Sequence, residues 1–286
     1  MMKTILVTTD FSAPSQTAAR YALYLANAMK AHLVLCHAIQ VSSTVTIASK
    51  ASHSPDNFSS TYDAAVEQIQ FQVLSLTEKE ENDSPTTLVD YIVAPGSVTN
   101  VVNDVIKKRE ISLVVMGMFG AGAINRFLLG SNSQNLIDNR LGFPVLLVPF
   151  KEFPETVNKI AFASDLSDGD IGLIQSLASF ACPFDAEILI VHISGVKVDQ
   201  IQIDNFLKEV TAKINYHKIY YRHVEDKDIN RGLNWIARNG VIDVFAMVHR
   251  KNNFPGNIFS SSYTQNLSRS IHIPLLVFSE NEFPVF

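Results

Sequence analysis

Two segments of the sequence match each other residue by residue, so the chain is built from two related units. An offset of 155 residues takes Asp10 to Asp165 and His37 to His192, and each of these residues ends a short apolar run. Further along, an offset of 131 residues takes 111–116 to 242–247. The second copy is therefore about 24 residues shorter in its middle. We expect most of the extra length of the first copy to form a long surface loop at 42–60.

Each copy alternates short apolar runs with amphipathic segments, which is typical of βαβ units around a parallel sheet. In the first copy the residues at 15–30 carry an apolar face at helical spacing. Ser97 is placed to cap a second helix, and Ser131 or Ser133 a third. The polar segment 151–156 separates the copies, which places one domain at 1–150 and another at 156–280. The five runs of the first copy are 5–9, 32–39, 87–93, 113–117 and 145–148.

The composition narrows the classes of function. The chain has 286 residues, 47% of them hydrophobic, and a formal net charge of -5. Its basic residues are scattered, so we expect no nucleic-acid partner, and no apolar stretch approaches the roughly 20 residues of a membrane-spanning helix. The N-terminal apolar run is shorter than a secretory signal, which predicts a cytoplasmic protein. Cys36 and Cys182 lack metal-binding spacing, and we expect both thiols to be buried and reduced.

A glycine-rich segment with the spacing Gly-x2-Gly-x9-Gly-Ser follows the fourth apolar run of the first copy. Gly117 falls where a strand is expected to end, so the chain can turn there and a ligand can approach the backbone. Gly130 precedes a predicted helix, whose free N–H groups and positive dipole end suit phosphate oxygens. The hydroxyls of Ser131 and Ser133 add hydrogen-bond donors. The segment predicts a phosphate-binding loop, and a purely structural connection is the alternative.

Asp10 ends the first predicted strand, at the edge where open parallel sheets bind ligands. Its carboxylate would repel phosphate groups, so ribose hydroxyls or an adenine edge are its expected partners. His37 and His192 end equivalent strands, which favours a shared packing and hydrogen-bonding role over a catalytic one.

The glycine spacing, Asp10 and His37 together resemble the universal stress protein family, and the resemblance covers both copies. It implies two tandem flavodoxin-like (adenine nucleotide alpha hydrolase-like) α/β domains. Each would have a five-stranded parallel sheet of order 3-2-1-4-5 with helices on both faces. The family also implies that domains pair along their last strands. Here 145–148 and 275–278 are expected to pair within one chain, and a homodimer is left open.

The resemblance to ATP-binding members of the family implies an ATP site in the first domain, with Mg²⁺ carried on the phosphates and no dedicated metal site. Asp10 would meet the ribose or adenine, and the backbone at Ala38 would meet the adenine edge. The phosphates would be held by Gly117, Gly120, Gly130, Ser131 and Asn132. Thr9, Met116 and Ser133 complete the expected nucleotide-binding residues.

The second copy departs from this glycine motif. Val248, Lys251 and Ser261 stand where the first copy has its three glycines, and their side chains occupy the space that a backbone contact with a triphosphate needs. We therefore do not expect nucleotide binding by the second domain.

A candidate second ligand site keeps Asp165, Ser261 and Ser262, although an aspartate at a strand end is as often an Asx turn or a helix cap. His249, Arg250 and Lys251 are expected to form a solvated loop, with an anion or a smaller ligand as the alternative.

Two classes of function follow. The first is an ATP-binding module for stress response or signalling, with one competent site in the first domain. The alternative is a non-nucleotide scaffold or chaperone-like protein in which the glycine loop is a relic. The sequence has no paired carboxylates, Ser/His/Asp arrangement or Walker lysine placed for phosphoryl transfer, so slow ATP hydrolysis is the most that we expect of it as an enzyme.

Overall fold

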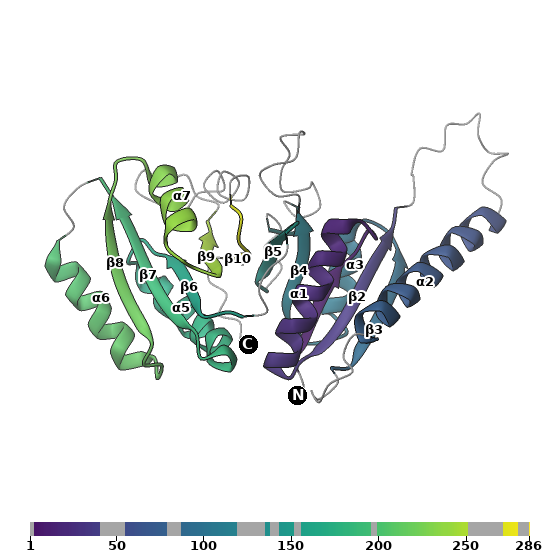
Figure 1. Cartoon of the computed structure of the whole chain (residues 1–286), viewed down its shortest axis with the longest axis horizontal. Helices are drawn as coiled ribbons and strands as arrows, with labels where there is room; N and C mark the ends of the chain where they lie inside the picture. Colours follow the sequence, from purple (N-terminus) through teal and green to yellow (C-terminus); the bar gives the residue numbers. More distant parts are fainter. Residues whose placement is uncertain are drawn as a thin grey trace.

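The computed structural model describes residues 3–40, 55–78, 87–118, 135–137, 143–151, 156–195, 199–250, 271–279 and 286. The described strands form a single ten-stranded sheet of order β3-β2-β1-β4-β5-β10-β9-β6-β7-β8 (Figure 1). Each half of this sheet has the order 3-2-1-4-5 in its own numbering. The predicted α/β fold class with two flavodoxin-like sheets is confirmed.

The first half alternates strands and helices along the chain. Its strands are β1 (Thr4–Thr8), β2 (His32–Ile39), β3 (Val89–Pro95), β4 (Ile111–Met118) and β5 (Val145–Pro149). Its helices are α1 (Ala13–Met29), α2 (Pro55–Thr77) and α3 (Val98–Ile106). The side chain of Ser97 accepts a hydrogen bond from the amide of Asn100, which confirms its predicted role as the cap of α3.

The second half repeats this arrangement. Its strands are β6 (Lys159–Ala163), β7 (Glu187–Ser194), β8 (Ile219–Glu225), β9 (Val244–His249) and β10 (Leu275–Ser279). Its helices are α5 (Asp168–Ala181), the short 3-10 helix η2 (Cys182–Phe184), α6 (Gln200–Lys213) and α7 (Ile229–Asn239).

Equivalent residues of the two halves have equivalent partners in the sheet. Val7 of β1 pairs with Leu35 of β2 and Val115 of β4. Phe162 of β6 pairs with Ile190 of β7 and Ala246 of β9. The sequence offsets of 155 and 131 residues relate these two sets. The offsets can therefore be used to compare the two halves residue by residue at the sheet edge.

The two halves meet along β5 and β10. These strands pair antiparallel, with Leu146 opposite Leu276, whereas every other strand pair among the described residues is parallel. Each half therefore covers an edge strand that the other would otherwise leave exposed.

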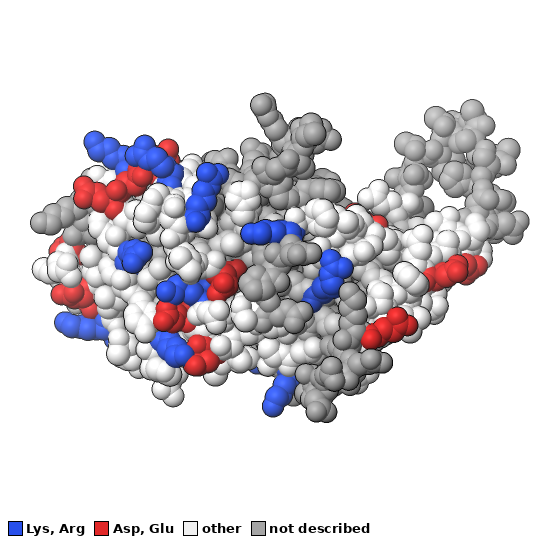
Figure 2. Space-filling view, in the orientation of Figure 1, with Lys and Arg blue, Asp and Glu red and all other residues white. Residues whose placement is uncertain are grey.

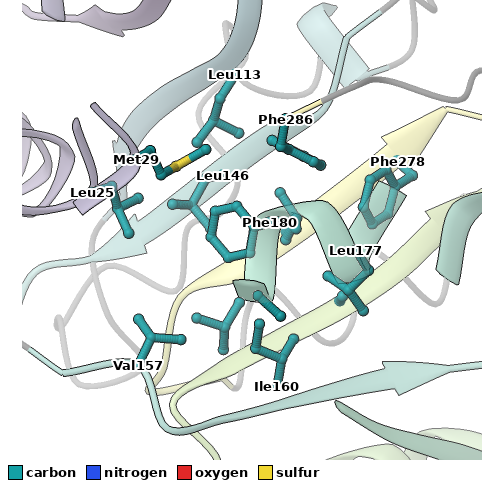
Figure 3. Close-up of a cluster of buried hydrophobic side chains, with 14 of the residues drawn as sticks. Leu25, Met29, Leu113, Leu146, Val157, Ile160, Leu177, Phe180, Phe278 and Phe286 are labelled. Atoms are coloured by element: carbon teal, nitrogen blue, oxygen red, sulfur yellow. The ribbon is translucent and has the colours of Figure 1, made fainter. Parts of the chain in front are cut away.

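Helices cover both faces of the sheet, and the core on each face runs through both halves. The apolar residues of α1, α2, α5 and α6 belong to one buried cluster, and those of α3 and α7 belong to a second. The first cluster includes Leu25 and Met29 of α1, Leu146 of β5 and Phe180 of α5, whose ring packs against that of Phe286 (Figure 3). This continuous apolar layer stabilises the contact between the halves, because apolar surface from both is removed from water.

Charged side chains lie mainly on the surface. On the face seen in Figure 2, basic and acidic residues of the second half are interspersed. The ion pairs of the second half include Lys218–Asp185 and Arg231–Asp226, each with at least one exposed side chain. Pairs of this kind contribute about 0–1 kcal/mol each.

Two expectations require correction. The expected surface loop at 42–60 lies outside the described residues up to 54, but α2 already begins at Pro55, so its last part is helical. Cys182 is exposed, whereas Cys36 is buried as expected. Cys182 lies at the start of η2, where Pro183 ends the regular helix and the chain turns at the surface.

No helix of the described residues combines the length and the apolar character needed to cross a membrane.

The two cysteines should react very differently in the folded chain. Burial raises the pKa of the Cys36 thiol to about 12, so Cys36 has almost no thiolate at neutral pH. We expect a thiol-specific disulfide reagent to modify one thiol per folded chain, at Cys182, and both thiols after denaturation. Cys182→Ser should abolish the native reaction. Rapid modification of two thiols in the native chain would contradict this prediction.

Candidate functional site

The described residues among those predicted to bind nucleotide lie at the carboxyl ends of β1, β2 and β4. β1 lies between the other two strands, and Thr8 pairs with Cys36 on one side and with Met116 on the other. The amide of Thr9 donates to the carbonyl of Cys36 at 2.9 Å, which extends this alignment beyond the end of β1. The topology thus brings Thr9, Asp10, Ala38, Met116 and Gly117 to one edge, as expected for an open parallel sheet.

Asp10 is exposed and organises the turn that leads into α1. One of its carboxylate oxygens accepts hydrogen bonds from the amide, at 3.1 Å, and from the hydroxyl of Ser12, which is the N-cap residue of α1. Partial burial raises the pKa of Asp10. Hydrogen bonds from Ser12 and Ser15 outweigh this effect and hold the pKa below its ordinary value of 3.8. Asp10 is therefore ionised at neutral pH, a charged acceptor open to solvent.

A polar network fixes the backbone next to Asp10. Nδ1 of His37 lies 2.8 Å from the carbonyl oxygen of Thr9, and the ring of His37 stacks on Phe11 with 4.4 Å between centroids. The hydroxyl of Thr9 donates to the side-chain carbonyl of Gln72 at 2.9 Å. The histidine therefore positions backbone at the sheet edge, as its repeated occurrence indicated. Gln72 was not singled out from the sequence, because a glutamine on an amphipathic helix gives no local signal of a contact 63 residues away.

Ala38 and Met116 take different places at this edge. Ala38 is half-buried near the end of β2. The side chain of Met116 is 5% exposed and lies in the core beneath α3. Only the backbone of Met116 is therefore suited to contact a ligand at this edge.

Gly117 is explained by close packing within the chain. A Cβ atom at this position would lie 2.4 Å from the carbonyl oxygen of Pro14 and 2.8 Å from the amide nitrogen of Ser15, both in the first turn of α1. Such distances are far inside van der Waals contact. The glycine therefore allows α1 to begin directly against β4, which is a reason that the sequence motif did not reveal.

The remaining predicted residues, Gly120, Gly130, Ser131, Asn132 and Ser133 in the first half and Ser261 and Ser262 in the second, lie outside the described residues. A groove of about 490 Å³ lies between the start of α1 and α2. None of the described residues predicted to bind nucleotide lines it. Its lining residues are Phe11, Gln16, Glu67, Gln68, Phe71, Gln72 and Ser75.

The equivalent edge of the second half is occupied by an arginine. Arg250, which follows β9, is 6% exposed and donates to Asp165 from one terminal nitrogen. Its other terminal nitrogen donates to Asp170 at 2.7 Å and to the hydroxyl of Ser167 at 3.0 Å. The expectation that Arg250 lies in a solvated loop is therefore wrong, because two carboxylates draw its side chain into the protein. Sequence reasoning missed Asp170, which lies in the first turn of α5.

Asp165 keeps the local geometry of Asp10 despite this difference. Its carboxylate accepts a hydrogen bond from the amide of Ser167 at 3.2 Å, so both aspartates form the same type of turn. Nδ1 of His192 lies 2.9 Å from the carbonyl oxygen of Ser164, as His37 does with Thr9 in the first half. Burial lowers the pKa of His192, so its ring is neutral at neutral pH.

The model of a family described as the universal stress protein family matches residues 1–149. The fold is similar to that of a universal stress protein from Archaeoglobus fulgidus DSM 4304, with a TM-score of 0.66 and 19% sequence identity over 96% of this chain and 98% of that chain.

A functionally unknown protein from Pseudomonas aeruginosa PAO1 is also similar, with a TM-score of 0.62 and 12% identity over 99% of this chain and 94% of that chain. At these identities the structural likeness establishes the fold. The search of curated proteins gave no match.

Proposed function

Because this chain belongs to the universal stress protein family, we propose that its first half binds ATP and that the chain acts as a stress-response or signalling module. One observation carries the proposal. Asp10 presents an ionised, exposed carboxylate at the sheet edge, whereas the carboxylate of Asp165 in the second half is paired with Arg250. The proposal therefore includes one competent nucleotide site per chain, in the first half.

The described residues fit the sugar and base end of a nucleotide. The Asp10 carboxylate can accept hydrogen bonds from ribose hydroxyls, and the backbone at Ala38 lies at the end of the neighbouring strand. The backbone at Thr9 is held in place by His37, so this part of the site is formed before a ligand arrives. A preformed site loses less conformational entropy when the ligand binds.

The phosphate end of the proposed site depends on the glycine motif. Gly120 and Gly130 would allow close backbone approach, and the hydroxyls of Ser131 and Ser133 would add donors, with Asn132 between them. Mg²⁺ would be carried by the phosphates. Met116 and Gly117, the first glycine of the motif, lie near the end of β4, which ends at Met118. The antiparallel contact of β5 with β10 supports the further proposal that the two halves stay paired within one chain in solution.

Titration calorimetry with ATP and Mg²⁺ tests the proposed site. We expect binding of one ATP per chain in the wild type, because only the first half keeps the motif. Gly130→Val should abolish binding, since a branched side chain would fill the space of the phosphate contact. Ser261→Val, the matched change in the second half, should leave binding intact.

The outcomes separate the proposal from its alternative. An absence of binding heat at high protein concentration would refute nucleotide binding and favour the scaffold or chaperone-like function. Equal losses of affinity in Gly130→Val and Ser261→Val would refute the assignment of the site to the first half.

A further inference from the structure

We propose that the second half has a site for a guanidinium group at the edge equivalent to that of the first half, and that Arg250 of the same chain is its resident ligand. The site, called here the guanidinium cradle, consists of Ser164, Asp165, Ser167 and Asp170. The proposal concerns the second half alone and does not depend on ATP binding by the first half.

The geometry of the cradle matches the planar, fork-shaped donor set of a guanidinium group. Asp165 and Asp170 accept from different terminal nitrogens of Arg250, and Ser167 accepts from one of them. Asp170 is completely buried, and the side chain of Arg250 is 7% exposed. An arginine held at this depth by two carboxylates and a hydroxyl is bound by the protein as a ligand would be.

Contacts that do not involve Arg250 also hold Asp170 in the cradle. The hydroxyl of Ser164 donates to one oxygen of Asp170 at 2.6 Å, and the amide of Asp165 donates to the same oxygen at 3.2 Å. This leaves the other Asp170 oxygen for Arg250. The carbonyl of Ser164 is held in turn by His192, whose ring pairs with His223 at 5.8 Å between centroids. The elements β6, β7 and α5 thus position both carboxylates toward one point.

Arg250 and Asp170 are both present in the second half, and both are replaced in the first half. The residue equivalent to Asp170 is Ser15, and the residue equivalent to Arg250 is Phe119, so the first half has neither charge. Ser15 instead bonds to the carbonyl of Ser12 at 2.9 Å, and Asp10 stays exposed. The second half therefore contains a buried acid and a buried base that satisfy each other at the strand end where the first half has the exposed Asp10.

Protonation of Asp170 gives the cradle a defined pH response. Burial and the nearby Asp165 raise the pKa of Asp170 to about 7, against the opposing effect of Arg250 and Ser164. Among the described residues, the charged or titratable groups around it are Asp165, Arg250 and, behind Ser164, the neutral His192. Since the pKa in the folded chain exceeds 3.8, the stability contributed by Asp170 is present at low pH and decreases as the pH rises toward 7. Without Arg250 the pKa would rise further.

Replacement of Arg250 followed by chemical rescue tests the proposal. Arg250→Ala should lower the melting temperature by about 5 to 8 °C, because it leaves the buried carboxyl group of Asp170 without its partner. Methylguanidinium at about 20 mM should raise the melting temperature of Arg250→Ala by about 2 °C, in a saturable manner. Methylammonium at the same concentration should give a smaller rise, because it lacks the planar fork.

The matched control is Arg231→Ala. Arg231 makes two hydrogen bonds to Asp226, at 2.8 and 2.6 Å, but its side chain is 69% exposed. We expect this change to lower the melting temperature by about 1 °C or less, with no rescue by methylguanidinium. The loss caused by Arg250→Ala should be larger at about pH 8 than at about pH 5.5, because protonation of Asp170 removes its unpaired charge.

Three results would overturn the proposal: equal melting temperatures for Arg250→Ala and the wild type, no saturable rescue, or an equal response of the wild type to methylguanidinium. If Arg250→Ala does not fold, Arg250→Ala/Asp170→Ser provides the test. This double variant restores the residue of the first half at position 170, so we expect it to fold without a response to methylguanidinium. A double variant that also fails to fold, or that responds, would contradict the proposed cradle.

Discussion

Phe180→Ala should lower the free energy of unfolding by about 3–5 kcal/mol. The ring of Phe180 is completely buried, with centroids 5.6 Å from that of Phe184 and 5.2 Å from that of Phe286. It lies in the apolar layer that α1 and α5 share across the two halves (Figure 3). Removal of the ring leaves a cavity that packed neighbours from two helices and the sheet cannot fill without moving. Urea denaturation followed by circular dichroism measures the loss.

Phe71→Ala is the matched control for Phe180→Ala. Phe71 lies on α2 and its side chain is 74% exposed, so its removal takes little apolar surface from the core. We expect a change within about 0.5 kcal/mol. Similar effects of the two substitutions would show that the shared layer does not stabilise the chain in the way that its burial indicates.

Gly117→Ala should lower the free energy of unfolding by about 1–3 kcal/mol, although it adds a single methyl group. The new Cβ atom would lie 2.4 Å from the carbonyl oxygen and 2.5 Å from the carbonyl carbon of Pro14. Those atoms belong to the backbone of α1, which is capped by Ser12 and packed on the sheet, so relief requires movement of the helix. The loss should appear as a lower midpoint of urea denaturation.

Gly169→Ala is the control for Gly117→Ala. Gly169 is the equivalent of Pro14 in the second half, and a Cβ atom there would meet only the hydroxyl of Ser167, at 4.0 Å. Alanine is favoured over glycine in a helix, so this variant should be as stable as the wild type or more stable, by up to about 1 kcal/mol. A loss in Gly169→Ala as large as that in Gly117→Ala would contradict the explanation by close packing.

The α/β class could be predicted from the sequence because the alternation of apolar runs and helices is a local pattern, whereas the strand order was implied by the resemblance to the universal stress protein family. The alternation of apolar runs and helices requires parallel strands, and right-handed crossovers then restrict the topology. The expected run at 32–39 coincides with β2. The predicted end of the loop at 42–60 was wrong, because α2 begins at Pro55. The first residues of α2 are polar, so their composition resembles that of a loop.

Only some residues of the candidate site could be predicted from the sequence. Asp10 was identified because it follows a strand, where sequence position fixes spatial position, and Ala38 because the family resemblance implied it. Gln72 and Asp170 were not identified, since their contacts depend on how α2 and α5 pack against β1 and β6. The Gly120 and Gly130 parts of the motif lie outside the described residues and stay predictions.

The sequence by itself determined that two related α/β units follow one another and that only the first keeps the glycine motif, because spacing and residue type are properties of the chain alone. The tertiary structure decided what each aspartate meets. Asp10 and Asp165 form the same turn at the same strand end, yet one is open to solvent and the other is paired with Arg250. That partner follows β9, 85 residues further along the chain. It reaches Asp165 because β6 and β9 are neighbours in the sheet and because Asp170 and Ser167 accept hydrogen bonds from its other terminal nitrogen.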